Sequence, residues 1–253
     1  MSFSNAKVLS VEPLKNSDAE WAKLVKLTYT DSKSQTRTWE SAERTTRPKN
    51  SDIDGVGIVA ILEKPTGPEI VLQKQYRAPI DKVTIEVPAG LVDEGETVEE
   101  AAIRELKEET GYVAKPSETS PMMFNVKRSI TRLSWQWPNK VEGDFTLRNP
   151  SDSPVLPEIT HTSRDLADWG LDPGFCNTNL RMVHVTVDMS LPENQNLQPE
   201  LEEDEFIEVF LVPLTKLYDE CKRFEAEGYA IDARVGTFAE GIECAKQFKL
   251  WAQ

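Results

Sequence analysis

The chain has 253 residues, of which 39% are hydrophobic and 28% are charged, and its formal net charge is −14. This length and composition are typical of a globular protein with a sizeable core. The negative charge excludes a protein built for polyanionic partners, so we expect neither nucleic-acid binding nor docking on an anionic membrane. A small anionic substrate stays compatible with it, because a bound divalent cation would reverse the local charge.

The chain begins with a predicted β-hairpin. Residues 21–31 and 36–41 have the composition of two strands, and residues 31–35 are turn-like. A hairpin alone is only marginally stable in water, so this one must pack on its own domain or on a partner chain. Residues 45–54 form a polar link to the rest of the chain.

Strands and helices follow this link. Short apolar stretches predict strands, and amphipathic stretches predict helices. The predicted strands are 56–62, 70–76, 84–87, 180–188 and 206–212, and the predicted helices are 97–110, about 215–228 and 237–250. Thr97 and Glu100 form a capping box at the start of the first helix, and Gly111 supplies its C-terminal stop.

The three cysteines, Cys176, Cys221 and Cys244, indicate a reducing compartment. Their number is odd and none forms a Cys-x-x-Cys pair, so we expect three small buried side chains and no disulfide framework. Residues 1–16 lack the apolar run of a secretory signal, and no stretch reaches the ~20 apolar residues that span a bilayer. The expected location is the cytosol, and the sequence is also compatible with a nuclear pool.

Residues 90–112 carry the strongest chemical pattern in the chain. Gly90 is followed by five residues and Glu96, then by seven residues and Arg104-Glu105-Leu106-Lys107-Glu108-Glu109-Thr110-Gly111-Tyr112. Glu105, Glu108 and Glu109 are spaced i, i+3 and i+4, so they share one helix face. Such carboxylates repel one another, whereas Mg²⁺ prefers a set of hard oxygen ligands. The pattern therefore predicts a divalent-metal site, with Arg104 paired to one of the glutamates.

The alternative interpretation of this helix is a solvated acidic face, which we retain for Glu99, Glu100 and Lys107. The glycines indicate a special loop before the helix. Gly90 and Gly95 suit backbone angles that other residues avoid, although Gly95 also fits an ordinary turn.

This pattern is similar to the Nudix box, and the resemblance extends over most of residues 21–250. Stretches outside the box resemble the ADP-ribose and ADP-sugar pyrophosphatase branch of the eukaryotic Nudix family. They are residues 39–47, 54–56, 75–77, 85–90, 172–174, 204–209 and 232–235. The resemblance implies an α/β/α sandwich, with a mixed β-sheet between helices. It also implies a β-hairpin arm at residues 1–50, exchanged in a homodimer, and a hydrolase domain at residues 51–253.

The resemblance further implies Mg²⁺-dependent hydrolysis of the diphosphate in ADP-ribose or another ADP-sugar, which gives AMP and a sugar phosphate. Mn²⁺ would substitute for Mg²⁺. The implied metal ligands are the carbonyl of Ala89 and the side chains of Glu105, Glu108 and Glu109. The implied catalytic residues are Glu205, Glu109 and Arg104. Glu205 would be the base that orients or deprotonates the attacking water, and its alternative is a solvated acidic loop.

Six positions match substrate contacts of the resembled branch. They are Trp21, Trp39, Glu40, Arg44, Arg77 and Asp172. Trp21 and Trp39 match two tryptophans that sandwich the adenine, one from each subunit of a domain-swapped dimer, and their alternative is a place in a strand core. Glu40 and Arg44 match contacts to the adenine or the adjoining phosphates. Arg77 matches a contact to the diphosphate, with a surface salt bridge as its alternative.

Residues 126–171 are surplus to the resembled family, since residues 122–125 could lead directly into Asp172. A long segment with so little periodicity is uncommon inside a compact domain. Two interpretations stand, a disordered insertion and a translated, unspliced intron, and reading the transcript across these codons distinguishes them. Next to Asp172, the segment would cap the substrate site or obstruct the dimer. A further interpretation is therefore that the protein with this segment is inactive.

Two other functions compete with ADP-sugar hydrolysis. One is a Nudix hydrolase for another nucleoside diphosphate derivative, such as NADH, a dinucleoside polyphosphate or a GDP-sugar. The other is a non-catalytic Nudix-fold module that binds ADP-ribose. The complete box disfavours the non-catalytic module, because such modules usually have eroded boxes.

Overall fold

The structure is a computed structural model, and it describes residues 3–49, 51–124, 174–203 and 205–250. The surplus segment 126–171 and Asp172 lie outside the described residues, so their interpretation stays a prediction. Within the described ranges, no helix is long and apolar enough to cross a membrane.

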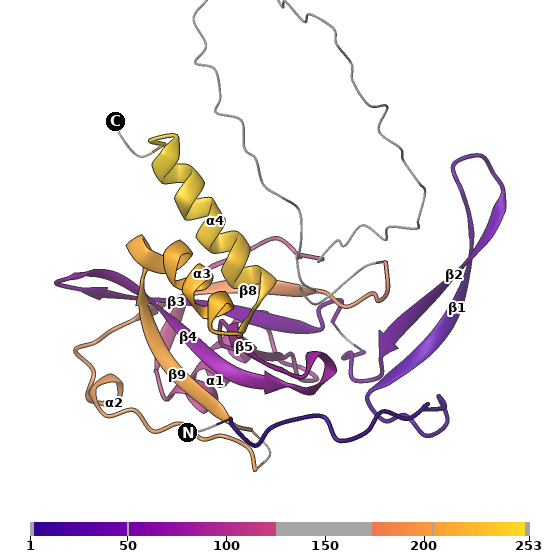
Figure 1. Cartoon of the computed structure of the whole chain (residues 1–253), viewed down its shortest axis with the longest axis horizontal. Coiled ribbons are helices and arrows are strands. Elements are labelled where there is room, and N and C mark those ends of the chain that lie inside the picture. The colour runs from indigo at the N-terminus through magenta and orange to yellow at the C-terminus, as the bar shows by residue number, and fades with distance from the viewer. Residues whose placement is uncertain (1–2, 50, 125–173, 204, 251–253) are drawn as a thin grey trace, which may run out of the picture. The chain divides into compact units, whose positions relative to one another are not determined.

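The described residues form strands and helices, and most of the strands come before the first α-helix (Figure 1). The strands are β1 (Ala22–Thr30), β2 (Thr36–Arg44), β3 (Gly55–Lys64), β4 (Gly67–Arg77), β5 (Lys82–Glu86), β6 (Ala89–Leu91), β7 (Ala114–Thr119), β8 (Leu180–Val187), β9 (Ile207–Pro213) and β10 (Ala230–Ile231). The helices are α1 (Val98–Thr110), α2 (Pro192–Gln195), α3 (Leu217–Ala226) and α4 (Ala233–Gln247), and short 3₁₀ turns are η1 (Ala78–Ile80) and η2 (Leu214–Lys216).

The large sheet is mixed, with the order β10-β5-β4-β3-β8-β7. Strand β3 runs parallel to β8 and antiparallel to β4, and β6 pairs with the beginning of β3. Strand β9 pairs antiparallel with β4. The sheet therefore places β6, which leads into α1, beside the beginning of β3.

Apolar side chains cover both faces of this sheet, as expected for strands buried on two sides. On one face, Val71 and Val183 pack with Leu106 of α1. On the other face, Leu72 packs with Leu217 of α3 and other residues of α3 and α4, which lie together in Figure 1. The arrangement confirms the predicted α/β/α sandwich with a mixed sheet between helices.

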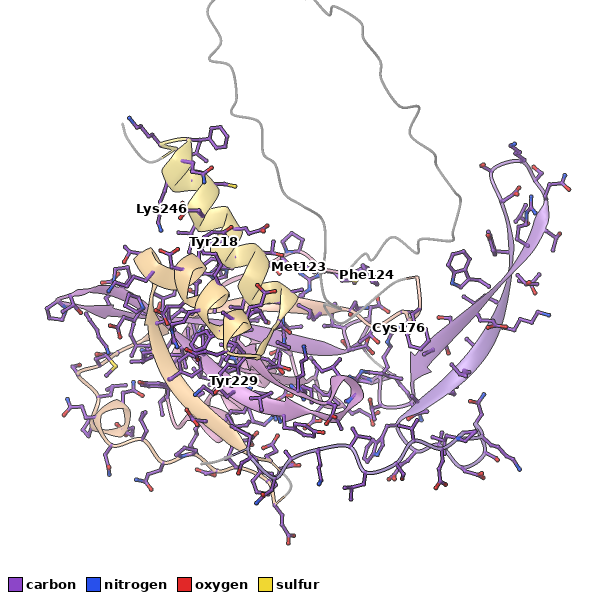
Figure 2. The ribbon with its side chains drawn as sticks, viewed as in Figure 1. Met123, Phe124, Cys176, Tyr218, Tyr229 and Lys246 are labelled. Carbon is purple, nitrogen blue, oxygen red and sulfur yellow. The ribbon has the colours of Figure 1, made fainter. Side chains whose placement is uncertain are left out.

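The α3 side also carries aromatic packing. Phe224 meets Phe210 and Tyr229 edge-on, with ring centroids 5.5 and 5.9 Å apart. Figure 2 labels Tyr229. Lys74 of β4 lies over the rings of both Phe210 and Tyr229, 5.5 Å from each centroid. Edge-on rings and a cation over a ring face are favourable, and they fix β4 and β9 on the α3 layer.

Most predicted elements are confirmed, with shifted ends. Thr97 and Glu100 form the predicted capping box, and Gly111 caps α1 in the left-handed region at φ 77°. Helix α4 begins at Ala233 rather than at 237, because the Asp232 side chain accepts the Arg234 N–H at 2.7 Å and caps it. The predictions omitted β6, β7, β10 and α2, which are short or polar and have weak periodicity.

The prediction of three buried cysteines is right only for Cys221. Cys176 is half-buried, and Cys244 is exposed on α4, so those two predictions were wrong. A small apolar-like residue on a helix near the chain's end need not point inward. All three thiols are free, in agreement with the expected absence of a disulfide framework.

The predicted hairpin forms a separate two-stranded sheet. Strands β1 and β2 pair antiparallel from Ala22–Arg44 to Thr30–Thr36. Its link to the rest of the described chain includes a parallel bridge between Ala42 and Cys176, which Figure 2 labels. Almost every side chain of β1 is exposed, so the hairpin has no core of its own.

Candidate functional site

Helix α1 presents the three glutamates of the predicted metal site, and Arg104 connects two of them. Arg104 Nη1 lies 2.9 Å from Glu105 Oε1 and 3.1 Å from Glu108 Oε2. Its Nε and Nη2 donate to the carboxylate of Glu96 at 2.9 and 3.0 Å, and Nη2 also donates to the carbonyl of Leu91 at 3.0 Å. The predicted pairing of Arg104 with a glutamate is therefore observed. One guanidinium ties the loop before α1 to the helix face.

Gly90 lies against the carboxylate of Glu105. A Cβ at Gly90 would overlap the carboxyl group of Glu105, so only glycine leaves room for that side chain. The predicted reason for both glycines was an unusual backbone angle. It holds for Gly95, whose φ is 87°, but not for Gly90, whose φ is not positive. Close packing is the reason for a glycine at position 90.

Glu109 is almost completely buried, at 3% exposed. Its Oε2 accepts the backbone N–H of Ala89 at 2.9 Å, and its Oε1 accepts Gln73 Nε2 at 3.2 Å. Burial raises the pKa of Glu109 to about 8, the two hydrogen bonds oppose the rise, and the charges of Glu105 and Glu205 add to it. A buried carboxylate among like charges favours a cation nearby.

Glu105 is in a similar environment. Burial raises the pKa of its carboxyl, Arg104 opposes that rise, and the negative charges of Glu108 and Glu205 add to it. Glu205 thus lies close enough to act on both Glu105 and Glu109, although it belongs to the segment before β9. Its side chain is half-buried and accepts the Glu202 N–H at 3.2 Å. This location differs from the alternative of a freely solvated acidic loop.

The residues present fit a divalent cation, although their side chains do not converge on one point. Among the described residues, no group of three or more His, Cys, Asp or Glu is arranged closely enough to hold a metal ion. Arg104 binds Glu105 and Glu108, which accounts for this arrangement. The buried Oε1 of Gln73, beside Glu109, has no hydrogen-bond partner. Crowded carboxylates and an unpaired acceptor suit a hydrated hard cation.

Arg77 makes a bidentate ion pair with a buried carboxylate. Its Nε and Nη2 donate to the two oxygens of Glu86 at 2.7 and 2.8 Å, and Glu86 is 3% exposed. Arg234 Nη2 lies 3.5 Å from the same carboxylate, and Arg234 also pairs with Asp232 at 2.7 Å. Glu86 and Arg234 were not among the predicted site residues. The only sign of them in the sequence was that both belong to stretches that resemble the family.

Gln73 is the other residue that the sequence analysis missed. It belongs to β4 with Arg77, and alternate residues of a strand point to the same face. Val71 on that face packs with the α1 layer. The polar residues Gln73 and Arg77 therefore continue the α1-facing side of β4 toward the glutamates. Polar residues at alternate positions of a buried strand were the signal that could have found it.

The two tryptophans are exposed, at 64% for Trp21 and 42% for Trp39, so neither is a strand-core residue. Trp39 lies opposite Leu27, and six residues from position 21 to position 27 span about 20 Å in an extended strand. The two indoles of one chain therefore do not face each other. Trp39 Nε1 donates to the carbonyl of Gly174 at 2.9 Å.

Glu40 and Arg44 lie on the other face of the hairpin from Trp39. Glu40 pairs with Lys26 and Arg44 with Ala22, and residues an even number apart share a face. The structure thus places four of the predicted substrate residues on the arm and one, Arg77, at the end of β4. Asp172, the remaining member of the prediction, lies outside the described residues.

Comparisons with known proteins found similar chains over most of this length. The model of the NUDIX domain matches residues 53–234. The chain is 41% identical over 249 residues to a protein of Saccharomyces cerevisiae named ADP-ribose pyrophosphatase, covering 97% of this chain and 87% of that protein. It is 38% identical over 242 residues to an uncharacterised Nudix hydrolase of Schizosaccharomyces pombe, covering 96% and 95% of the two chains.

A more distant relative shares much of the same length. The chain is 29% identical over 231 residues to a Mus musculus protein named ADP-sugar pyrophosphatase, covering 90% of this chain and 84% of that protein. The two fungal alignments include both the hairpin and the residues around α1, because they cover 97% and 96% of this chain.

Proposed function

The chain belongs to the Nudix family, and from that premise we propose that it hydrolyses the diphosphate of ADP-ribose or a related ADP-sugar, with a divalent cation. The observation that carries the proposal is the carboxylate face of α1, where buried Glu109 and half-buried Glu105 lie within electrostatic reach of Glu205. The names of the yeast and mouse relatives support the substrate class.

Glu105, Glu108 and Glu109 would hold the cation, with the Ala89 carbonyl as a further ligand. When bound, a Mg²⁺ or Mn²⁺ ion supplies positive charge beside the diphosphate and lowers the pKa of a water. Arg104 keeps Glu105 and Glu108 oriented through its two ion pairs. The Ala89 N–H fixes the Glu109 carboxylate, so the loop and the helix present their oxygens together.

Glu205 is the base in this proposal. Its position outside α1 leaves its carboxylate free of Arg104, whereas Glu105 and Glu108 are both paired with that arginine. A carboxylate beside the diphosphate can accept a proton from the attacking water. Attack on one phosphorus breaks the bond to the bridging oxygen, and ADP-ribose then gives AMP and ribose 5-phosphate.

Arg77 and the hairpin bind the substrate in this proposal. The guanidinium fork of Arg77 suits a diphosphate. Arg234 is close enough to Glu86 to pair with its carboxylate when Arg77 turns to the ligand. Trp21 and Trp39 would stack on the adenine, and their separation within one hairpin supports a pair formed by two subunits. The exposed apolar residues of β1 support a homodimer that covers them.

The free cysteines support a reducing compartment such as the cytosol. The test of the function is release of AMP from a panel of ADP-ribose, ADP-glucose, NADH and a diadenosine polyphosphate, with Mg²⁺, with Mn²⁺ and with chelator. Metal-dependent release of AMP from ADP-ribose is the expected result. Binding of ADP-ribose without any turnover would favour the non-catalytic module instead.

A further inference from the structure

Asn194 is the buried anchor of the segment that leads from β8 to Glu205. It belongs to α2 and is 2% exposed, while the other described residues from 188 to 206 are half-buried or exposed. Its Oδ1 accepts the Val113 N–H at 2.7 Å, and its Nδ2 donates to the carbonyls of Val113 and Asp188, each at 2.8 Å. One side chain thus satisfies three backbone groups and joins this segment to the residues that follow α1.

The residues after α2 cross the C-terminal end of α1. The Glu200 N–H donates to the carbonyl of Glu108 at 2.8 Å. This carbonyl is in the last turn of the helix, where carbonyls lack an intrahelical partner. A Cβ at Gly111 would lie 2.6 Å from the backbone N of Gln198, so the segment lies directly on the helix end. We call residues 194–200 the tether.

The tether ends close to Glu205 along the chain. The Glu205 N–H donates to the carbonyl of Glu202 at 3.1 Å, and the Glu205 carboxylate accepts the Glu202 N–H at 3.2 Å. On the other side, Ile207 pairs with Gln75 of β4. Glu205 therefore lies between two fixed points, Glu200 on α1 and Ile207 on the sheet. Its negative charge reaches the carboxylate face of α1 from this position.

We propose that Asn194 is a positioning residue for the reaction, and that it holds Glu205 beside the metal-binding glutamates through the tether. This inference rests on the proposed function, in which Glu205 is the base. Removal of the Asn194 amide would leave buried backbone groups without partners, so the amide favours one position of the segment. A displacement of about 1 Å at a reacting group can cost about 10²-fold in rate.

The test is a double-mutant cycle on the hydrolysis of ADP-ribose with Mg²⁺. Asn194→Ala removes the anchor, and it is made in the wild type and in Glu205→Gln. Asn179→Ala is the matched control. Asn179 is 4% exposed and also bridges two backbone groups, the N–H of Asp54 at 3.2 Å and the carbonyl of Asp52 at 2.8 Å. The readouts are kcat, KM and the unfolding temperature of each variant.

The expected result is a fall in kcat of about 10- to 100-fold for Asn194→Ala in the wild type, with KM within about twofold. In Glu205→Gln, the same change should lower kcat by less than about twofold, because no base is left to displace. Asn179→Ala should change kcat by the same factor in both backgrounds, whatever its effect on the unfolding temperature. Equal factors for Asn194→Ala in the two backgrounds would mean a structural role only and overturn the proposal.

A second pair of variants keeps the test decisive if Asn194→Ala does not fold. Glu200→Pro removes the N–H that binds the Glu108 carbonyl, and Glu200 is exposed, so the core is untouched. Glu200→Gln is its matched control, because it keeps that N–H and removes only the charge that pairs with Lys107 at 2.8 Å. The effect of Glu200→Pro on kcat should depend on Glu205, whereas any effect of Glu200→Gln should be equal in both backgrounds. Equal factors for Glu200→Pro would overturn the proposal.

Hydrogen exchange separates this inference from the proposed function. The Glu200 amide reports the contact of the tether with α1, and its bond goes to Glu108 rather than to Asn194. In Asn194→Ala this amide should exchange about tenfold faster than in the wild type, while Asn179→Ala leaves it unchanged. Unchanged exchange in Asn194→Ala overturns the tether, whatever the activity. If the wild type does not hydrolyse ADP-ribose, or Glu205→Gln keeps normal turnover, the proposed function fails instead.

Discussion

The hairpin β1–β2 and the strands β3–β4 are both antiparallel pairs, yet they bury their side chains very differently. Leu24 of β1 is 61% exposed and Leu27 is 44% exposed, whereas Ile58 of β3 and Leu72 of β4 are fully buried. The body of the sheet therefore has its own cores, one toward α1 and one toward α3 and α4. The stability of the hairpin depends on the contacts that attach it to the body, such as the Arg47–Asp54 ion pair, and on a surface that covers its apolar side chains.

Under the proposed function, this difference separates substrate binding from chemistry. The body carries the acidic face of α1 and Glu205, while the hairpin carries the tryptophans. Substitutions in the body should change turnover or the free energy of unfolding. Substitutions in the hairpin should change substrate affinity and leave the stability of the body almost unchanged.

The largest expected effect belongs to Glu205. The change Glu205→Gln removes the proposed base but keeps the shape of the side chain, so kcat should fall by about 10²- to 10⁴-fold while KM changes little. Steady-state kinetics with ADP-ribose measures this. Glu203→Gln is the control, because Glu203 is an exposed member of the same acidic run. A normal kcat in Glu205→Gln would remove Glu205 from the role of base.

The next effect concerns the free energy of unfolding. Leu106 of α1 is fully buried in the core beneath the box helix, so Leu106→Ala should cost about 2–5 kcal/mol. The matched change Leu24→Ala in the hairpin should cost less than about 1 kcal/mol, because Leu24 is already exposed. Chemical denaturation of both variants gives the comparison. Equal losses would mean that the hairpin is part of the folding core.

The effect on substrate affinity should be smaller. Trp39→Ala removes the proposed stacking surface for the adenine, so KM for ADP-ribose should rise by about tenfold with kcat nearly unchanged. Trp39→Phe is the matched control, since it keeps an aromatic face and loses the indole N–H that binds Gly174. We expect Phe to recover most of the affinity. A loss of kcat without a change in KM would place Trp39 outside the base-binding role.

The sequence predicted those parts of the fold and site whose residues are near one another along the chain. The capping box at Thr97, the glutamate face of α1 and the pairing of Arg104 follow from helical spacing. The hairpin and the strands of the sandwich follow from the alternation of apolar residues and from turn residues. Short strands such as β6 and β10 were missed, because a few residues carry no periodicity.

Contacts between distant residues could not be read in this way. Arg77, Glu86 and Arg234 meet only because β4, β5 and the start of α4 come together in the fold. Arg47 pairs with Asp54, and Asp54 also accepts the N–H of Asn179, which is far along the chain. Composition does not say which arginine will meet which buried carboxylate. The resemblance identified the stretches that contain these residues, but it gave no role for the pairing.

The free cysteines offer a measurement that changes no residue. Cys244 is exposed on α4 and should react first with an alkylating reagent. Burial raises the pKa of Cys221 to about 11, so at pH 8 only about one thiol in a thousand is a thiolate there. Cys221 should therefore react slowest, at a rate set by unfolding of the body.

Cys176 tests the boundary between the two regions. It is half-buried and its backbone bridges to Ala42 of the hairpin, so its alkylation should follow detachment of the hairpin rather than unfolding of the body. Mass spectrometry of peptides over time measures the three rates. Arg47 donates to Asp54 and to the carbonyl of Asn177, next to Cys176. Arg47→Lys should therefore accelerate labelling of Cys176 and leave that of Cys221 unchanged, since only the attachment of the arm is weakened. Parallel acceleration of both thiols would mean that the hairpin and the body open as one unit.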